Sequence, residues 1–228
     1  MRRHTIAVLS AGMLALIVSD GTSVAADVPV PKTYTDAMRW YRDSARAGDP
    51  KAMFYLGLTL EQGLQDRPRP QEAVNWYRRS AEAGFALAQF KLGVLYQTGQ
   101  AVERDLAKAR TWYEHAAKQG MPSAQYNLAV LLETDEGGPA DPARALDLYH
   151  KAAEFGVPEA FLNLGNLYAR GEGVEADAVE ALKWLNLAVD AGIEAADALR
   201  QSVLVVLDQQ DRERARAEAD RWKAAHPR

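Results

Sequence analysis

The sequence predicts an all-α protein, a stack of helix pairs that repeats every 36 residues. The first observation is a column of tryptophans at one fixed spacing. These residues are Trp40, Trp76, Trp112 and Trp184, with Leu148 in the remaining slot. Glycine and alanine columns share this spacing, and they are Gly48, Gly84, Gly120, Gly156 and Gly192, and Ala52, Ala88, Ala124, Ala160 and Ala196. Self-similarity at a period of about 20 to 50 residues is typical of stacked repeat proteins. Since no single pair buries its own apolar face, we expect one continuous core.

Each unit holds two helical patterns. In the first pattern, Ala88, Leu92 and Tyr96 lie four residues apart and therefore share one helical face. Gly93 lies beside that face, and its equivalents are Gly57 and Gly165. A glycine inside a helix costs about 1 kcal/mol relative to alanine. We therefore expect this column to allow a close approach of the partner helix, which carries the tryptophan column.

Capping residues mark the ends of the helices. Asp105, Asp141 and Asp177 stand where side chains can accept from free backbone N–H groups. Pro142 suits a first helical turn, and the glycine column suits left-handed helix ends. These signals predict helices at residues 34–47, 50–62, 70–83, 86–98, 106–119, 122–134, 142–155, 158–170, 178–191, 194–207 and 211–224.

Residues 1–26 have the organisation of a secretory signal peptide. Arg2 and Arg3 precede an apolar stretch, and small residues precede a cleavage site before Asp27. The apolar stretch, about 13 residues, is shorter than the roughly 20 that a membrane-spanning helix needs. We therefore expect cleavage, no stable membrane insertion, and an exported protein in the periplasm or, alternatively, in the medium. An uncleaved anchor is the other interpretation.

The remaining chain divides into three parts. Residues 27–33 form a short linker, residues 34–192 carry the repeats, and residues 193–228 hold a degenerate last repeat with a charged capping helix. In the last part Asp220 replaces the column tryptophan, and we expect Trp222 to anchor the helix. This pattern is typical of a terminal repeat that faces solvent on its outer side.

Composition argues against several kinds of function. Proteins that bind nucleic acid carry a strong basic patch, and a formal net charge of −4 argues against this function. The net charge of the whole chain does not exclude a local basic patch. The chain has no cysteine, which excludes disulfides, cysteine nucleophiles and thiolate metal sites. His115, His150 and His226 lack the spacing of a metal-binding helix, and no nucleophile or phosphate-loop motif is found. We expect no catalytic residue, no metal and no cofactor.

Several segments resemble the Sel1-like repeat, a relative of the tetratricopeptide repeats with longer loops. The matching segments are residues 88–96 (AQFKLGVLY), 108–120 (KARTWYEHAAKQG), 161–168 (FLNLGNLY) and 171–174 (GEGV). Asp135 in place of a loop glycine and Leu148 in place of tryptophan depart from the pattern. The resemblance implies a right-handed superhelix, or α-solenoid, of antiparallel helix pairs. It also implies an adaptor role, since bacterial members assemble envelope complexes, restrain sensors or contact host proteins. Some cysteine-rich relatives are linked to β-lactams, but this chain lacks those cysteines.

The resemblance to tetratricopeptide repeats also places one stripe of the first helices along a concave groove. The candidate partner-binding residues on this stripe are Lys51, Tyr55, Leu58, Lys91, Val94, Asn127, Val130, Asn163, Asn166 and Arg170. Their mixture of apolar side chains, amides and few charges suits a peptide or a helix. We expect them to be surface positions. The alternative is that some of them only support neighbouring helices.

We therefore expect an exported, non-enzymatic adaptor or scaffold of the bacterial envelope, which binds a segment of another protein. The alternatives are an envelope hydrolase acting on peptidoglycan or a β-lactam, and a secreted factor that binds host protein. The sequence shows no convergent set of serine, histidine and carboxylate, which argues against the hydrolase.

Overall fold

The computed structural model describes residues 34–63 and 67–227, and within these ranges it contains eleven α-helices. They are α2 (Tyr34–Arg46), α3 (Pro50–Gln62), α4 (Pro70–Glu82), α5 (Ala86–Thr98), α6 (Leu106–Lys118), α7 (Pro122–Glu133), α8 (Pro142–Glu154), α9 (Pro158–Arg170), α10 (Ala178–Asp190), α11 (Ala195–Val206) and α12 (Gln209–Ala225). All eleven predicted helices are confirmed, with ends within two residues. The predicted signal peptide and linker lie outside the described residues and stay predictions.

Aspartate side chains cap three helices at the positions that the sequence predicts. The side chains of Asp105, Asp141 and Asp177 accept hydrogen bonds from backbone N–H groups of the first turns of α6, α8 and α10. Asp208 caps α12 in the same way, through the N–H of Asp211 at 2.9 Å, and α12 begins two residues earlier than predicted. Gly99 ends α5 with φ +72°, in the left-handed region that glycine adopts readily.

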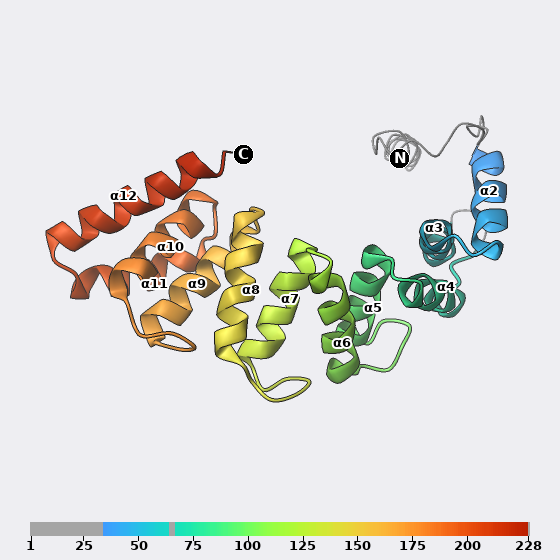
Figure 1. Ribbon diagram of the computed structural model, residues 1–228, viewed down its shortest axis with the longest axis horizontal. Coiled ribbons are helices and arrows are strands. Elements are labelled where there is room, and N and C mark those ends of the chain that lie inside the picture. Colours follow the sequence, from blue (N-terminus) through green and yellow to red (C-terminus); the bar gives the residue numbers. More distant parts are fainter. Residues whose placement is uncertain (1–33, 64–66, 228) are drawn as a thin grey trace.

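The helices form a solenoid of antiparallel pairs. Each helix from α2 to α10 packs against the next, and both α11 and α12 pack against α10. In Figure 1 the stack is a shallow arc with α2 and α12 at its two ends. The longer loops after α5, α7 and α9 lie along one edge of the arc, and the short turns lie along the other.

The glycine column allows the close helix contact that the sequence predicts. A Cβ atom added to Gly93 would lie 2.5 Å from the Tyr113 ring on α6. Gly57 and Tyr77 repeat this relationship at 2.6 Å, one period earlier. Real Cβ atoms do not approach other atoms this closely, so only glycine fits these positions without movement of the ring. The cost of a helical glycine is offset by the packing of a buried tyrosine.

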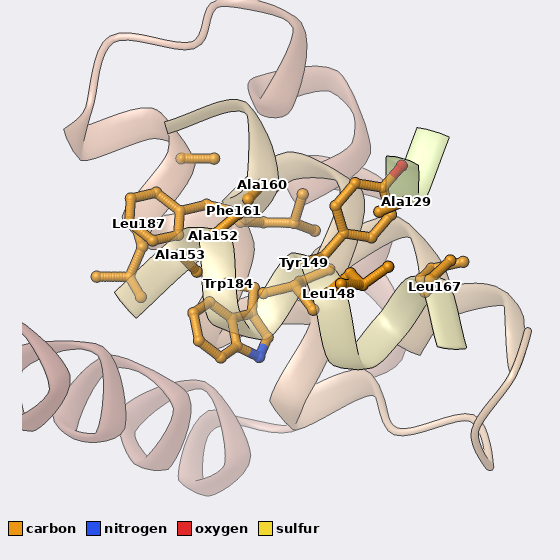
Figure 2. Close-up of a cluster of buried hydrophobic side chains, with 14 of the residues drawn as sticks. Ala129, Leu148, Tyr149, Ala152, Ala153, Ala160, Phe161, Leu167, Trp184 and Leu187 are labelled. Atoms are coloured by element: carbon orange, nitrogen blue, oxygen red, sulfur yellow. The ribbon is translucent and has the colours of Figure 1, made fainter. Parts of the chain in front are cut away.

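The core follows the stack from end to end, but its buried side chains fall into two clusters. One cluster belongs to α2 through α5, and the other extends from α6 to α12. Tyr96 is partly buried and packs against both clusters, so it links them. Figure 2 shows part of the second cluster, in which Tyr149, Phe161 and Trp184 lie among small alanines. The partly buried side chains between the two clusters keep the core continuous along the stack.

The last helix covers the end of the stack. Ala215 and Ala219 are its buried residues, and most of its other side chains are exposed. The ring of Trp222 lies 5.1 Å from Phe161 and 5.9 Å from Trp184 between centroids, which places it as the anchor of α12. Lys223 adds an ion pair with Asp190 of α10 at 2.7 Å.

Candidate partner-binding surface

A polar cluster links three successive helices around the hydroxyl of Tyr77. The Tyr77 ring is fully buried on α4, and its hydroxyl donates to Glu61 Oε2 of α3 at 2.7 Å. Lys91 of α5 lies 2.9 Å from Glu61 Oε1 and 5.6 Å from the centre of the Tyr77 ring. Burial and the negative charge of Glu61 raise the pKa of Tyr77 well above its usual range. The tyrosine therefore stays a neutral donor.

The next repeat builds the same arrangement with different chemistry. The Tyr113 hydroxyl of α6 donates to Gln97 Oε1 of α5 at 2.6 Å. The side-chain amide of Asn127 of α7, one period after Lys91, lies near this hydroxyl and acts to lower its pKa. Burial raises the pKa of Tyr113 to about 12, and the amide of Asn127 opposes that shift. A neutral acceptor and an amide thus replace the ion pair of the previous repeat.

The third repeat combines both kinds of contact. The Tyr149 hydroxyl of α8 donates to Glu133 Oε2 of α7 at 2.8 Å. The side-chain amide of Asn163 of α9 lies near the hydroxyls of Tyr149 and Tyr126 and acts to lower the pKa of both. Arg170 at the end of α9 pairs with Glu133 Oε1 at 2.8 Å. We call these three clusters the tyrosine ladder, and its members are Tyr77, Tyr113 and Tyr149, Glu61, Gln97 and Glu133, and Lys91, Asn127 and Asn163.

The ladder stops where the repeats approach the C-terminal end. One period further on, the three positions hold Leu185, Ala169 and Leu199. Leaving one partner of a buried hydrogen bond unsatisfied costs about 1–3 kcal/mol. Replacing the whole set by apolar residues avoids that cost, which explains why all three positions change together.

The structure places nine of the ten candidate residues at half-buried positions, and only Arg170 is exposed. Lys91, Asn127 and Asn163 contact the ladder tyrosines, and Arg170 reaches the ladder through Glu133. The apolar candidates pack against the core, and they are Tyr55, Leu58, Val94 and Val130. Lys51 and Asn166 form no side-chain hydrogen bond or ion pair within residues 34–63 and 67–227.

This distribution corrects the expectation that the stripe consists of surface positions. Lys91, Asn127 and Asn163 lie near the tyrosines of the preceding helix, because each first helix packs against the second helix of the pair before it. The alternative, that some of these residues support neighbouring helices, therefore holds for Lys91, Asn127 and Asn163.

The acceptor column of the ladder is the part that sequence reasoning missed. Its members Glu61, Gln97 and Glu133 are not among the ten candidate residues, and all three are half-buried. A signal was available, because Glu61, Gln97 and Glu133 each precede a buried tyrosine by 16 residues.

A local basic pocket lies near the N-terminal end of the stack. It has a volume of about 260 Å³ between α2, α3 and α4, and its lining includes Arg42, Arg46, Arg67 and Arg69. Arg69 pairs with Glu72 at 3.0 Å. The negative net charge of the chain thus conceals one local concentration of arginines.

The histidines occupy separate positions. His150 is half-buried, with Nε2 3.2 Å from the Tyr168 hydroxyl, and burial lowers its pKa. The His226 ring stacks on Trp222 at 4.2 Å, and His115 is exposed. Among the described residues, no group of three or more histidine and acidic side chains could hold a metal ion. No helix in the described ranges is both long and apolar enough to cross a membrane.

Comparison with known proteins agrees with this geometry. The family model for the Sel1 repeat matches residues 13–49, 50–85, 86–121, 122–156 and 158–193. The chain belongs to the Sel1 repeat family. The first matched unit begins inside the segment interpreted as a signal peptide, and the next three begin at α3, α5 and α7.

Solved structures of other Sel1 repeat proteins are similar to this one. A Sel1 repeat protein from Oxalobacter formigenes is 31% identical with a TM-score of 0.64, and the match covers 84% of this chain and 81% of that one. The protective antigen c5321 of uropathogenic Escherichia coli is 28% identical with a TM-score of 0.57, over 86% of this chain and 50% of that one. No curated protein sequence matches the chain. The Sel1 repeat fold generally serves protein–protein interaction and is typically a non-catalytic scaffold.

Proposed function

We propose that this Sel1 repeat protein is an exported, non-enzymatic adaptor that binds a segment of a partner protein along the stripe of α3, α5, α7 and α9. The observation that carries the proposal is the repetition of half-buried amides beside half-buried apolar residues. Asn127 and Asn163 recur at the period of the stack, and Val94 and Val130 recur beside them. A binding surface for an extended or helical segment needs this combination of polar and apolar contacts.

The tyrosine ladder supports this proposal because it fixes the amides before a partner arrives. Each asparagine side chain offers two N–H donors and one acceptor, and a tyrosine hydroxyl does not use all of them. The remaining groups suit the N–H and C=O groups of a peptide backbone. Since the side chains are already held, binding orders fewer of them and loses less conformational entropy.

Export rests on the pattern of residues 1–26, a basic start followed by a short apolar stretch and small residues. It places the adaptor in the periplasm or outside the cell. The bacterial envelope is then the source from which a partner should be captured.

The test uses Asn166→Arg, because Asn166 lies on the stripe and its side chain forms no hydrogen bond or ion pair in the described ranges. The processed protein is crosslinked in a cell-envelope extract, and the captured protein is identified by mass spectrometry. We expect Asn166→Arg to reduce capture by at least about tenfold, or roughly 1.4 kcal/mol. Gln71→Arg makes the same kind of change at an exposed position of α4 and should leave capture unchanged. Equal capture by all three proteins would contradict the proposed surface.

A further inference from the structure

A cleft on the side of the second helices breaks the regularity of the repeats. It lies between α6 and α8, above α7, and has a volume of about 180 Å³. Ala117, Gln125, Leu128 and Leu148 provide its less exposed lining, and Lys151 lies on its α8 side. Two departures from the 36-residue pattern meet in this cleft.

The first departure is Leu148, which occupies the tryptophan column. In the cleft before it, Trp112 packs against the buried side chains of α2 through α5. In the cleft after it, Trp184 stacks on Phe161 of α9 with ring centres 6.0 Å apart, and both rings are visible in Figure 2. Leucine is much smaller than tryptophan and has no planar ring. Leu148 therefore fills less of this cleft than a tryptophan would, and the cleft beside it has a volume of about 180 Å³.

The second departure leaves a buried acceptor without a donor. One period earlier, Gln89 is also buried, and Gln119 Nε2 donates to Gln89 Oε1 at 2.7 Å. The residue one period after Gln119 is Phe155, which has no side-chain donor and is 67% exposed. Gln125 is only 5% exposed, and its Oε1 has no hydrogen-bond partner among the described residues. A buried amide oxygen of this kind favours a ligand that brings a donor.

The flanking cation completes the comparison. Three residues after Trp76, the guanidinium of Arg79 lies 4.5 Å from the centre of its ring. Lys183 covers Trp184 at 4.6 Å. Lys151 occupies the column of Arg79 beside Leu148 and pairs with Asp147 at 2.6 Å instead. An aromatic ring in this cleft would meet a cation from the column that covers Trp76. Trp184 takes its cation, Lys183, from a different column, which holds Asp147 in this repeat.

We propose that this cleft binds the indole side chain of a tryptophan presented by the partner protein. An indole supplies a flat apolar ring for the space above Leu148 and one N–H donor for Gln125 Oε1. The volume is adequate, since a cavity of about 150 Å³ holds a benzene ring. This inference rests on the proposed adaptor function. It adds a second contact with the partner, which lies between the second helices α6 and α8, whereas the stripe lies on the first helices.

The first experiment uses indole and 1-methylindole as probes, followed by ¹⁵N NMR of the processed protein. Indole should shift the side-chain amide signal of Gln125, and 1-methylindole should bind about fivefold more weakly because it lacks the N–H donor. Leu148→Trp restores the repeat pattern, fills the cleft and should abolish binding of both probes. The matched control Leu87→Trp adds a tryptophan at an exposed position of α5 and should leave binding unchanged.

A second variant, Gln125→Met, keeps the test decisive if Leu148→Trp fails to fold. Gln125→Met keeps the length of the side chain but removes the amide, so indole and 1-methylindole should bind it equally. Absence of saturable indole binding to the unmodified protein would overturn the inference. So would equal affinity for the two probes in the unmodified protein, or indole binding that survives in folded Leu148→Trp.

Capture from the envelope then separates this inference from the proposed function. If folded Leu148→Trp loses indole binding and captures at least about tenfold less partner, the partner uses the cleft. If it loses indole binding but captures the partner normally, the adaptor function stands and the tryptophan contact is excluded. If the unmodified protein captures no partner, the adaptor function itself fails, whatever the indole result.

Discussion

The hydroxyl of buried Tyr149 donates a 2.8 Å hydrogen bond to Glu133 Oε2, from the second helix of one repeat to the first helix of the same repeat. Glu133 is also paired with Arg170, so its carboxylate is shared between the ladder and the next first helix. Through this contact the stability of the stack and the candidate binding surface depend on the same side chains.

The first prediction concerns the ladder hydroxyls. Tyr113→Phe leaves Gln97 Oε1 and Asn127 without the hydroxyl that they share, and we expect a loss of about 1–2 kcal/mol in the free energy of unfolding. Tyr96→Phe is the control, because Tyr96 is half-buried but its hydroxyl has no hydrogen bond in the described ranges. The control should lose less than about 0.5 kcal/mol. Urea unfolding measures both, and equal effects would show that the hydroxyl does not act through the ladder.

The second prediction concerns alkaline pH. Burial raises the pKa of Tyr113 from its usual value of 10.0 to about 12, so the folded protein keeps this proton while the unfolded chain releases it. The contribution is constant below pH 10 and is lost between pH 10 and 12, by up to about 1.4 kcal/mol for each pH unit. Melting temperatures should therefore fall over that interval. Tyr113→Phe should show a shallower fall than the unmodified protein, and an identical slope would contradict the assignment.

How far sequence reasoning succeeds depends on where the partner of each residue lies. Helix ends were predictable because Asp105 and Gly99 act on backbone groups within a few residues. The glycine column was predictable because Gly93 and Tyr113 belong to one helix pair that recurs. The relation of Gln125 to Phe155 was not predictable from a single column. This relation depends on the hydrogen bond from Gln119, at the end of α6, to Gln89 on α5, and only the structure shows that bond.

The third prediction concerns close packing. Gly93→Ala places a Cβ atom 2.5 Å from the Tyr113 ring and should cost about 1–3 kcal/mol, despite the higher helix propensity of alanine. Ala129 occupies the same column in α7, and Ala129→Gly should cost about 1 kcal/mol from helix propensity and lost burial. A stabilising Gly93→Ala change in denaturant melts would mean that the α5–α6 contact is looser than described.

The fourth prediction concerns the leucine column of the first helices. Leu92, Leu128 and Leu164 are buried, as the period predicts, and Leu128 is 1% exposed. Leu128→Ala should destabilise the protein by about 2–5 kcal/mol, because it leaves a cavity between α6, α7 and α8. Leu87→Ala removes the same atoms from a 40% exposed side chain and should cost much less. A loss below about 0.5 kcal/mol for Leu128→Ala would be too small for a core leucine.

The last prediction joins stability to function. The triple change Lys91→Ala, Asn127→Ala and Asn163→Ala removes the outer partners of all three ladder tyrosines. We expect a lower melting temperature, because the side chains are half-buried and the hydroxyls lose contacts, while the helical content at 25 °C stays the same. Capture of the partner should weaken at least about tenfold. Tyr113→Phe with Tyr149→Phe serves as the control, since it lowers stability through the same ladder but retains the half-buried amides of Asn127 and Asn163. If both proteins, folded at the temperature of the assay, lose capture equally, the ladder hydroxyls matter for binding as much as the three side chains do, and direct contact of these side chains with the partner is not supported. If the triple change alone weakens capture, Lys91, Asn127 and Asn163 contact the partner directly.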